Sequence, residues 1–115
     1  MSYLVAERNS IQVVEVHELV NEFDNRVILK EIEGKIQQGF HKFVIDLSKI
    51  DFMNSIGINF LLMALKKSKN VGGKLALANI PNHVIHLLKI TKLDTVFSIQ
   101  PSVNDAIDSL KDEVF

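Results

Sequence analysis

The stretch FVIDLSKIDFMNSIGINFLLMALKKSKN, residues 43–70, contains two elements from which the rest of the chain can be placed. Its first five residues form a short apolar run rich in β-branched side chains, which is typical of a buried strand. Apolar residues then recur at helical spacing from Ser55 to Asn70, and Gly72-Gly73 ends that helix. The apolar run Lys74–Ala78 predicts a second strand. Strand, helix and strand in this order indicate a mainly parallel sheet.

The residues before this stretch predict a hairpin and a helix. Two Val-rich runs, residues 3–6 and 11–17, are separated by a polar break, which is typical of two paired strands. Isoleucines then recur every four residues between positions 28 and 36, with charged residues between them. This pattern predicts a helix with one buried stripe, capped by Asp24 or Asn25.

The residues after this stretch predict two more helices and a last strand. Pro81 stands where a first helical residue is favoured, and Val96–Ile99 is a short apolar run. Ser102-Val103-Asn104-Asp105 resembles a capping box that opens a final helix. We therefore expect a single α/β domain over residues 1–115, with about five strands and about four helices in the order ββαβαβαβα.

Composition excludes several classes of function. The chain has 115 residues, 47% of them hydrophobic, a formal net charge of −1 and no cysteine. Disulfides, thiol catalysis and thiolate metal sites are therefore absent, and no overall charge draws the protein to nucleic acid or to an acidic membrane surface. The first eight residues lack the apolar run of a signal peptide, and no window is long enough for a membrane helix. We expect a cytoplasmic protein.

Ser55 is the strongest candidate for a functional residue. It lies where the loop after residue 47 becomes a helix, and functional groups of parallel sheets gather in such loops. A helix N-terminus carries partial positive charge and unpaired N–H groups, so a phosphate on Ser55 is tolerated there. The alternative is that Asn54 and Ser55 only start the helix, as Asn and Ser often do. Gly57 would allow a partner to approach closely.

A second apolar row on the same helix favours a binding surface beside Ser55. At 100° per residue, Ile58, Leu61, Leu62 and Leu65 share one face of the helix and predict its core stripe. Ile56, Phe60 and Met63 fall on nearly the opposite side. Such an outer apolar patch suits a partner protein, although a neighbouring helix packed on it explains the pattern equally well.

Other constellations are weak, and we expect no cofactor, metal or catalytic site. His83 and His86 are three residues apart, but no third ligand is evident, so solvated histidines are favoured. Ser55 lacks a Gly-x-Ser-x-Gly elbow, and no phosphate-binding Gly-x-x-x-x-Gly-Lys element exists. A receiver-type phosphoacceptor would need an acidic pair after an early strand, and Asp46 lies inside its strand.

Over nearly its whole length the chain resembles the anti-sigma factor antagonist family, the STAS domain. Four segments carry the resemblance: Phe43–Ser48, Asp51–Ile58, Asn70–Leu75 and Leu87–Phe97. The Asn54-Ser55-x-Gly57-Ile58 core, placed after a strand and its Asp-Leu-Ser, is fairly specific in that context.

The resemblance implies a partner-switching mechanism in which the chain is not an enzyme. Unphosphorylated family members bind an anti-sigma factor that is itself a serine kinase, and so release a sigma factor. The kinase phosphorylates the serine that corresponds to Ser55, the complex is lost, and a PP2C-type phosphatase restores the binding form. We expect the partner to contact the following residues: Asp24, Met53, Asn54, Ser55, Ile56, Gly57, Phe60 and Met63.

The chain departs from the family pattern at several positions. Many members have Asp at position 54, Ser or Thr at position 56 and Gly at position 92, where this chain has Asn54, Ile56 and Lys92. The acceptor serine is kept. Two alternatives stay open: a constitutive STAS scaffold, and a small-ligand or nucleotide-binding STAS domain without phosphorylation. We expect a monomer or weak dimer that binds neither nucleic acid nor membrane.

Overall fold

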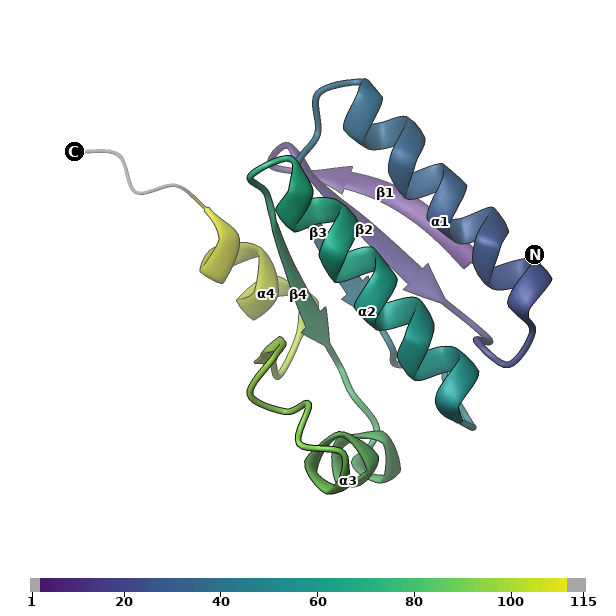
Figure 1. Ribbon diagram of the computed structural model, residues 1–115. Coiled ribbons are helices and arrows are strands. Elements are labelled where there is room, and N and C mark those ends of the chain that lie inside the picture. The colour runs from purple at the N-terminus through teal and green to yellow at the C-terminus, as the bar shows by residue number, and fades with distance from the viewer. Residues whose placement is uncertain (1–2, 112–115) are drawn as a thin grey trace.

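A computed structural model describes residues 3–111, so the predicted domain bounds of 1–115 extend past the described residues at both ends. The described part contains five strands and four helices in the predicted order (Figure 1). The elements are β1 Tyr3–Arg8, β2 Ile11–Val16, α1 Glu22–Gln37, β3 Lys42–Asp46, α2 Ser55–Asn70, β4 Lys74–Ala78, α3 Asn82–Ile90, β5 Ser98–Gln100 and α4 Val103–Leu110.

One mixed sheet forms the centre of the fold, with strand order β1-β2-β3-β4-β5. β1 and β2 form the predicted antiparallel hairpin, in which Arg8 pairs with Ile11 and Tyr3 with Val16. The other three pairs are parallel. The carboxyl ends of β2, β3 and β4 therefore meet at one end of the molecule, where the loops before α1, α2 and α3 also lie (Figure 1).

Helices cover both faces of the sheet. α1 and α2 lie side by side on one face, and α4 packs on the other (Figure 1). The sequence of strand β3 is continuously apolar because both of its faces are buried. Phe43 and Ile45 belong to the core under α1 and α2, whereas Val44 belongs to the core under α4. Burial of each such side chain is worth about 1.5–3 kcal/mol, so the two cores fix the sheet between its helices.

Element ends differ from the prediction where several residues compete for one role. α1 begins at Glu22 and its N-cap is Asn21, whose side chain accepts a hydrogen bond from the Asp24 N–H at 3.1 Å. The prediction that Asp24 or Asn25 caps this helix is therefore wrong. Asn25 lies inside α1 at 4% exposure and donates from Nδ2 to the Leu19 carbonyl at 3.0 Å. Its side chain is used for packing rather than capping.

Of three further element ends, two differ from the prediction and one agrees with it. Pro81 is the N-cap of α3 rather than its first residue, and β5 covers Ser98–Gln100 rather than 96–99. Ser102 caps α4 as predicted, accepting from the Asp105 N–H at 3.1 Å. Lys92 has a φ of 62°, the left-handed conformation that usually favours glycine.

Candidate functional site

The loops that follow β3 and β4 are tied together at the carboxyl end of the sheet. Asp46 Oδ1 accepts from the Ser48 N–H at 3.0 Å and from Asn79 Nδ2 at 3.1 Å. The Leu47 N–H donates to the Ala78 carbonyl at 3.0 Å. These bonds fix the start of the loop that leads to α2, so the helix begins from a defined position.

Asn54 caps α2 and leaves Ser55 exposed as the first helical residue. Asn54 Oδ1 accepts from the N–H groups of Ile56 at 3.1 Å and Gly57 at 3.3 Å. Ser55 itself is solvent-exposed. Because Asn54 already takes two N–H groups of the first turn, a phosphate on Ser55 competes with the cap for those donors. Its favourable interaction is then mainly with the helix dipole.

Gly57 serves the packing of the domain rather than the approach of another protein. It is buried, and a Cβ built on it would lie 2.2 Å from Met53 Sδ and 3.3 Å from the Leu19 carbonyl oxygen. The prediction that Gly57 makes room for a partner is therefore corrected: the close approach is internal. It brings the loop before α1 against the first turn of α2.

The two apolar faces of α2 pack against different parts of the domain. The predicted core face is confirmed at Ile58, Leu61 and Leu65, which are buried, whereas Leu62 is half-buried at its edge. On the other face Phe60 is only 1% exposed, because α1 packs along α2 and covers it. The predicted exposed patch is therefore wrong at Phe60, and the alternative of a neighbouring helix holds there.

The remaining predicted contact residues divide by exposure. Met63 is 36% exposed, whereas Met53 is buried at 7%. Ile56, Asn54 and Asp24 are half-buried. Fewer surface residues beside Ser55 are thus accessible to a partner than the sequence predicted. Met53, Gly57 and Phe60 are buried and pack beneath the surface residues.

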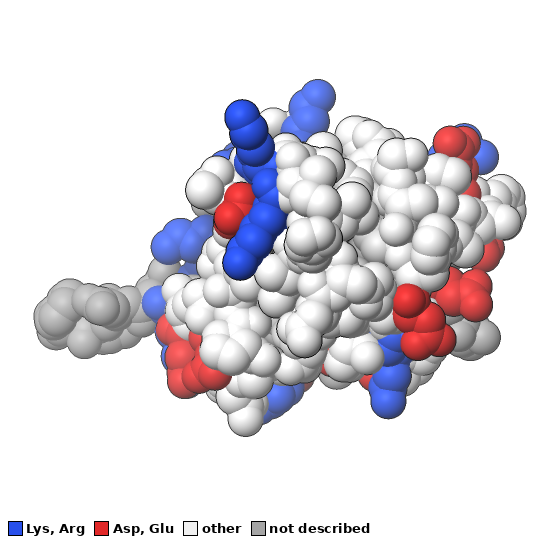
Figure 2. Space-filling view, turned by 90° about the horizontal axis from the view of Figure 1, so that it is seen from below, with Lys and Arg blue, Asp and Glu red and all other residues white. Residues whose placement is uncertain are grey.

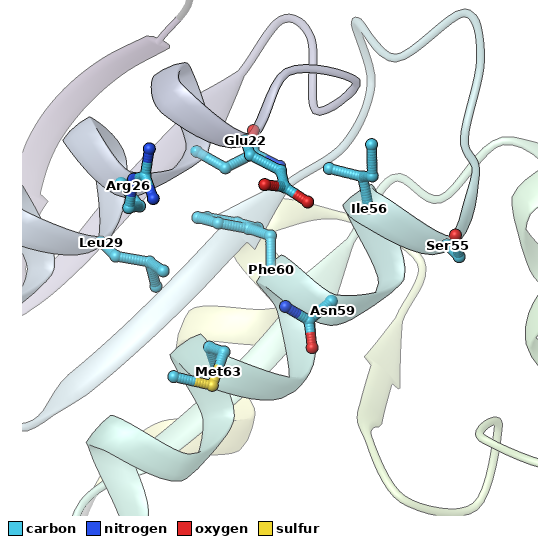
Figure 3. Close-up of a pocket in the computed structure, with 9 residues that line it drawn as sticks. Glu22, Arg26, Leu29, Ser55, Ile56, Asn59, Phe60 and Met63 are labelled. Atoms are coloured by element: carbon cyan, nitrogen blue, oxygen red, sulfur yellow. The ribbon is translucent and has the colours of Figure 1, made fainter.

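A groove of about 390 Å³ separates the first turns of α1 and α2 (Figure 3). The residues that line it come from both helices: Glu22, Asn25, Arg26, Leu29, Ser55, Ile56, Asn59, Phe60 and Met63. Figure 3 shows the Phe60 ring between the two helices, with Ser55 at one end of the groove beyond Ile56. Four of the predicted contact residues therefore border one groove: Ser55, Ile56, Phe60 and Met63.

Sequence reasoning missed a group of exposed apolar side chains close to this site. Phe52 is 60% exposed, Phe23 67% and Val20 38%. Phe52 and Val20 line a second hollow of about 260 Å³ with His17, Glu18 and Asp51. The available signal in the sequence was Phe52. It lies two residues before Asn54 and outside the helical stripe that predicts the core.

Charge is unevenly spread over this end of the molecule. Figure 2 looks onto the end where the parallel strands stop and shows a largely uncharged centre, with charged side chains of both signs around its edge. Within residues 3–111 no group of three His, Cys, Asp or Glu side chains could hold a metal ion. No helix of that described part is long and apolar enough to cross a membrane.

Comparison with known proteins identifies relatives over most of the chain. The STAS domain family model matches residues 3–106. BtrV of Bordetella bronchiseptica, provisionally named an anti-sigma factor antagonist, is 25% identical over 93 residues, which is 81% of this chain and 80% of BtrV. These matches agree with the resemblance that the Asn54–Ile58 core predicted.

Solved structures share the fold at low sequence identity. The Thermotoga maritima protein TM1081 superposes with a TM-score of 0.84 at 18% identity, covering 94% of this chain and 93% of that one. The anti-sigma factor antagonist SpoIIAA in its unphosphorylated form gives 0.80 at 19% identity, covering 98% and 99%. The phosphorylated form of SpoIIAA, from Bacillus, gives 0.73 at 19% identity, covering 95% and 99%. With its fold and its sequence both matched, this chain belongs to the STAS domain family.

Proposed function

We propose that this chain is an anti-sigma factor antagonist whose binding is switched by phosphorylation of Ser55. One observation carries the proposal: Ser55 is exposed at the first residue of α2, on the edge of a groove between two helices. The similarity to BtrV supports the class, and SpoIIAA exists in an unphosphorylated and a phosphorylated form.

In this proposal the chain is a ligand and a kinase substrate rather than an enzyme. Unphosphorylated, it binds an anti-sigma factor with serine kinase activity and so releases a sigma factor. Phosphorylation of Ser55 ends the complex, and a PP2C-type phosphatase restores the binding form. Such a cycle consumes ATP, which is consistent with a cytoplasmic location.

The physical basis of the switch is charge at a surface that is otherwise suited to docking. A phosphoserine carries about −1.5 to −2 charges at neutral pH. At the N-terminus of α2 the fold tolerates this charge, because the helix dipole offsets it by about 0.3–1 kcal/mol. A partner packed over Ser55 has to desolvate the phosphate or repel it, which costs several kcal/mol at an interface. Binding is therefore lost while the domain stays folded.

The acceptor is tested with purified kinases of the anti-sigma factor class from the source organism. Each is incubated with the chain and Mg-ATP, and the product is mapped by mass spectrometry. We expect phosphate on Ser55 and none in Ser55→Ala. Ser48→Ala is the matched control, because Ser48 is also exposed and only its backbone N–H bonds to Asp46. Phosphate on the Ser55→Ala protein, or on none of the serines, refutes the assignment.

The effect on binding is tested with two substitutions that differ only in charge. Ser55→Asp and Ser55→Asn have nearly the same shape, and their affinities for the phosphorylating kinase are measured by calorimetry. We expect Ser55→Asp to bind about thirtyfold more weakly than Ser55→Asn, which corresponds to about 2 kcal/mol of charge repulsion. Equal affinities would favour a constitutive scaffold instead.

A further inference from the structure

The sheet has two edge strands, and they are protected against further pairing to different degrees. β5 is one edge; it has three residues, and Pro101 follows it directly. Short edge strands and proline are common devices that prevent an edge from pairing with another chain. β1 is the other edge, has six residues, and pairs with β2 at every one of them without a bulge. Its only charged residues are the last two, Glu7 and Arg8, so the long edge lacks these devices.

The turn between β1 and β2 fixes the hydrogen-bond pattern of the hairpin. Asn9 and Ser10 have φ values of 56° and 65°, the left-handed conformation that a type I′ turn requires at both central residues. Such a turn is closed by a hydrogen-bonded pair, which here is Arg8 with Ile11. Hydrogen-bonded and non-hydrogen-bonded pairs alternate from there along the ladder. The alternation determines which way the backbone groups of each β1 residue point.

Three residues of β1 direct their backbone groups away from β2. Leu4 and Ala6 occupy the same phase of the ladder as the closing pair, so they bond to β2. The N–H and C=O groups of Tyr3, Val5 and Glu7 point outward instead. Within residues 3–111 no strand pairs with β1 on that side. The outer edge therefore presents three evenly spaced sets of donor and acceptor.

Exposed apolar side chains flank this edge on both faces of the sheet. Leu4 is 54% exposed on the face where α4 packs, because α4 lies over β2 to β5. On the other face α1 lies on the β1 side of α2 (Figure 1). Val27 of α1 is 41% exposed and lies about 120° or more around the helix from Leu29 and Glu33, which face α2. Apolar side chains gathered beside an unprotected edge are typical of an interface.

We infer that β1 pairs antiparallel with β1 of a second copy of this chain, about a two-fold axis that passes through Val5. In this register Val5 faces Val5 of the copy and Tyr3 faces Glu7, so all three outward-pointing residues form hydrogen-bonded pairs. With the axis at Leu4, Glu7 would have no partner in the other β1, and with the axis at Ala6, Tyr3 would have none. The register at Val5 is therefore the one that uses the whole edge.

The side chains are complementary in the same register. Leu4 faces Ala6 of the copy, a large side chain against a small one, and both are exposed in the single chain. Tyr3 faces Glu7, so a phenol hydroxyl can donate to a carboxylate and no like charges oppose each other. The two copies of α1 run antiparallel on either side of the axis, with Val27 on the sides that face each other.

The interface lies apart from the candidate site at Ser55. The groove beside Ser55 is formed between α1 and α2, whereas the dimer uses β1 and the far side of α1. A dimer of this kind would carry two accessible copies of Ser55. The inference is independent of the proposed function, because it needs neither a kinase nor phosphorylation.

Association is measured by sedimentation velocity of the full chain from about 10 µM to about 1 mM, a range suited to a small interface. We expect a concentration-dependent equilibrium between monomer and dimer. Leu4→Lys puts a charge into the apolar cross-strand pair of both copies and should raise the dissociation constant about tenfold. Ile90→Lys is the matched control and should leave the constant unchanged, because Ile90 is 65% exposed on α3, away from β1.

Disulfide formation tests the register, since the chain has no cysteine of its own. Leu4 and Ala6 of the copy form a non-hydrogen-bonded pair with Cα atoms about 4.5 Å apart, which a disulfide can bridge. Leu4 and its own counterpart in the copy are diagonal neighbours, about 7–8 Å apart, which is beyond that reach. An equimolar mixture of Leu4→Cys and Ala6→Cys should therefore oxidise mainly to the mixed disulfide, which mass spectrometry distinguishes from the two symmetric ones.

Each measurement has an outcome that contradicts the inference. A chain that stays monomeric at the highest concentration has no such interface. Equal dissociation constants for Leu4→Lys and the natural chain would show that association does not use β1. Equal weakening by Leu4→Lys and Ile90→Lys would assign it to exposed apolar residues in general. Symmetric disulfides as abundant as the mixed one would overturn the antiparallel register about Val5.

Discussion

Replacing Gly57 by alanine tests whether the first turn of α2 is held by close internal packing. The added Cβ would lie 2.2 Å from Met53 Sδ and 3.3 Å from both the Cβ and the carbonyl oxygen of Leu19. The thioether is buried and has to be displaced within the core, and Leu19 contributes backbone that has little freedom to give way. Insertion of a methyl group into such packing costs about 1–3 kcal/mol.

A smaller term of opposite sign accompanies this cost. Alanine in a helix is favoured over glycine by about 0.8–1.0 kcal/mol. Taking about 2 kcal/mol for the overpacking, we expect Gly57→Ala to lower the free energy of unfolding by about 1 kcal/mol, or about 4 °C in Tm for a domain of this size. Urea denaturation followed by circular dichroism measures the change, and an unchanged m-value shows that the unfolded state is the same.

Gly34→Ala is the matched control for this experiment. Gly34 also lies inside a helix, but a Cβ there meets no atom within 4 Å. The propensity gain of about 1 kcal/mol should then appear unopposed, and the two variants should differ by about 2 kcal/mol. If Gly57→Ala is stabilised as much as Gly34→Ala, the packing argument is wrong.

A double-mutant cycle locates the clash. Met53→Ala removes the sulfur that the new methyl would meet, at the usual cost of truncating a buried methionine. In that background Gly57→Ala should cost about 1 kcal/mol less than in the natural chain. An unchanged cost of Gly57→Ala would show that the strain lies at Leu19 instead.

Substitutions at three further positions, two of them in the site, are each tested by urea denaturation. Gly73→Ala would place a Cβ 1.9 Å from the His41 carbonyl oxygen, so we expect a loss above about 3 kcal/mol, and a loss below about 1 would show that this backbone can shift easily. Asn54→Ala should lose about 1 kcal/mol with the cap, whereas Asn54→Asp keeps the acceptor and should stay within about 0.5 kcal/mol; equal losses would contradict the capping role. Ser55→Asp should leave stability within about 0.5 kcal/mol or raise it, and marked destabilisation would mean that charge there acts on the fold.

The sequence was sufficient for elements whose ends are set locally. α2 covers residues 55–70 and β4 covers 74–78, both as predicted. The signals are local: only polar residues follow Leu65 up to Asn70, and Gly72, with a φ of 72° that an L-residue rarely adopts, separates the helix from the strand. Local chemistry alone fixes such ends, so no tertiary information was needed.

The start of α1 needed tertiary information. Asn21, Asp24 and Asn25 are all good capping residues, and their order in the sequence does not rank them. The capping residue is decided by a contact that Asn25 makes elsewhere. Asn25 points into the protein and donates to the carbonyl of Leu19, which lies six residues earlier in the sequence. Once Asn25 is buried, the helix must begin before it, and Asn21 is the residue left to cap.

The candidate site was only partly predictable for a similar reason. Helical periodicity shows that Phe60 lies off the core stripe of α2, but it does not show that α1 runs along that side. Gly57 likewise looks like an open position until Met53 and Leu19 are placed around it. Ser55 could be predicted, because its exposure follows from its position at a helix start and depends on no distant contact.

The first turn of α2 separates the proposed phosphorylation site from the packed core within three consecutive residues. Ser55 is exposed, Ile56 is half-buried and Gly57 is buried against the loop before α1. A charge added at Ser55 therefore meets solvent and the helix dipole, while the packing that positions the turn lies two residues further and on the other side. In the proposed function, phosphorylation of Ser55 would therefore change the surface charge strongly and the stability of the domain little, because the atoms that carry the charge are not the atoms that pack the first turn.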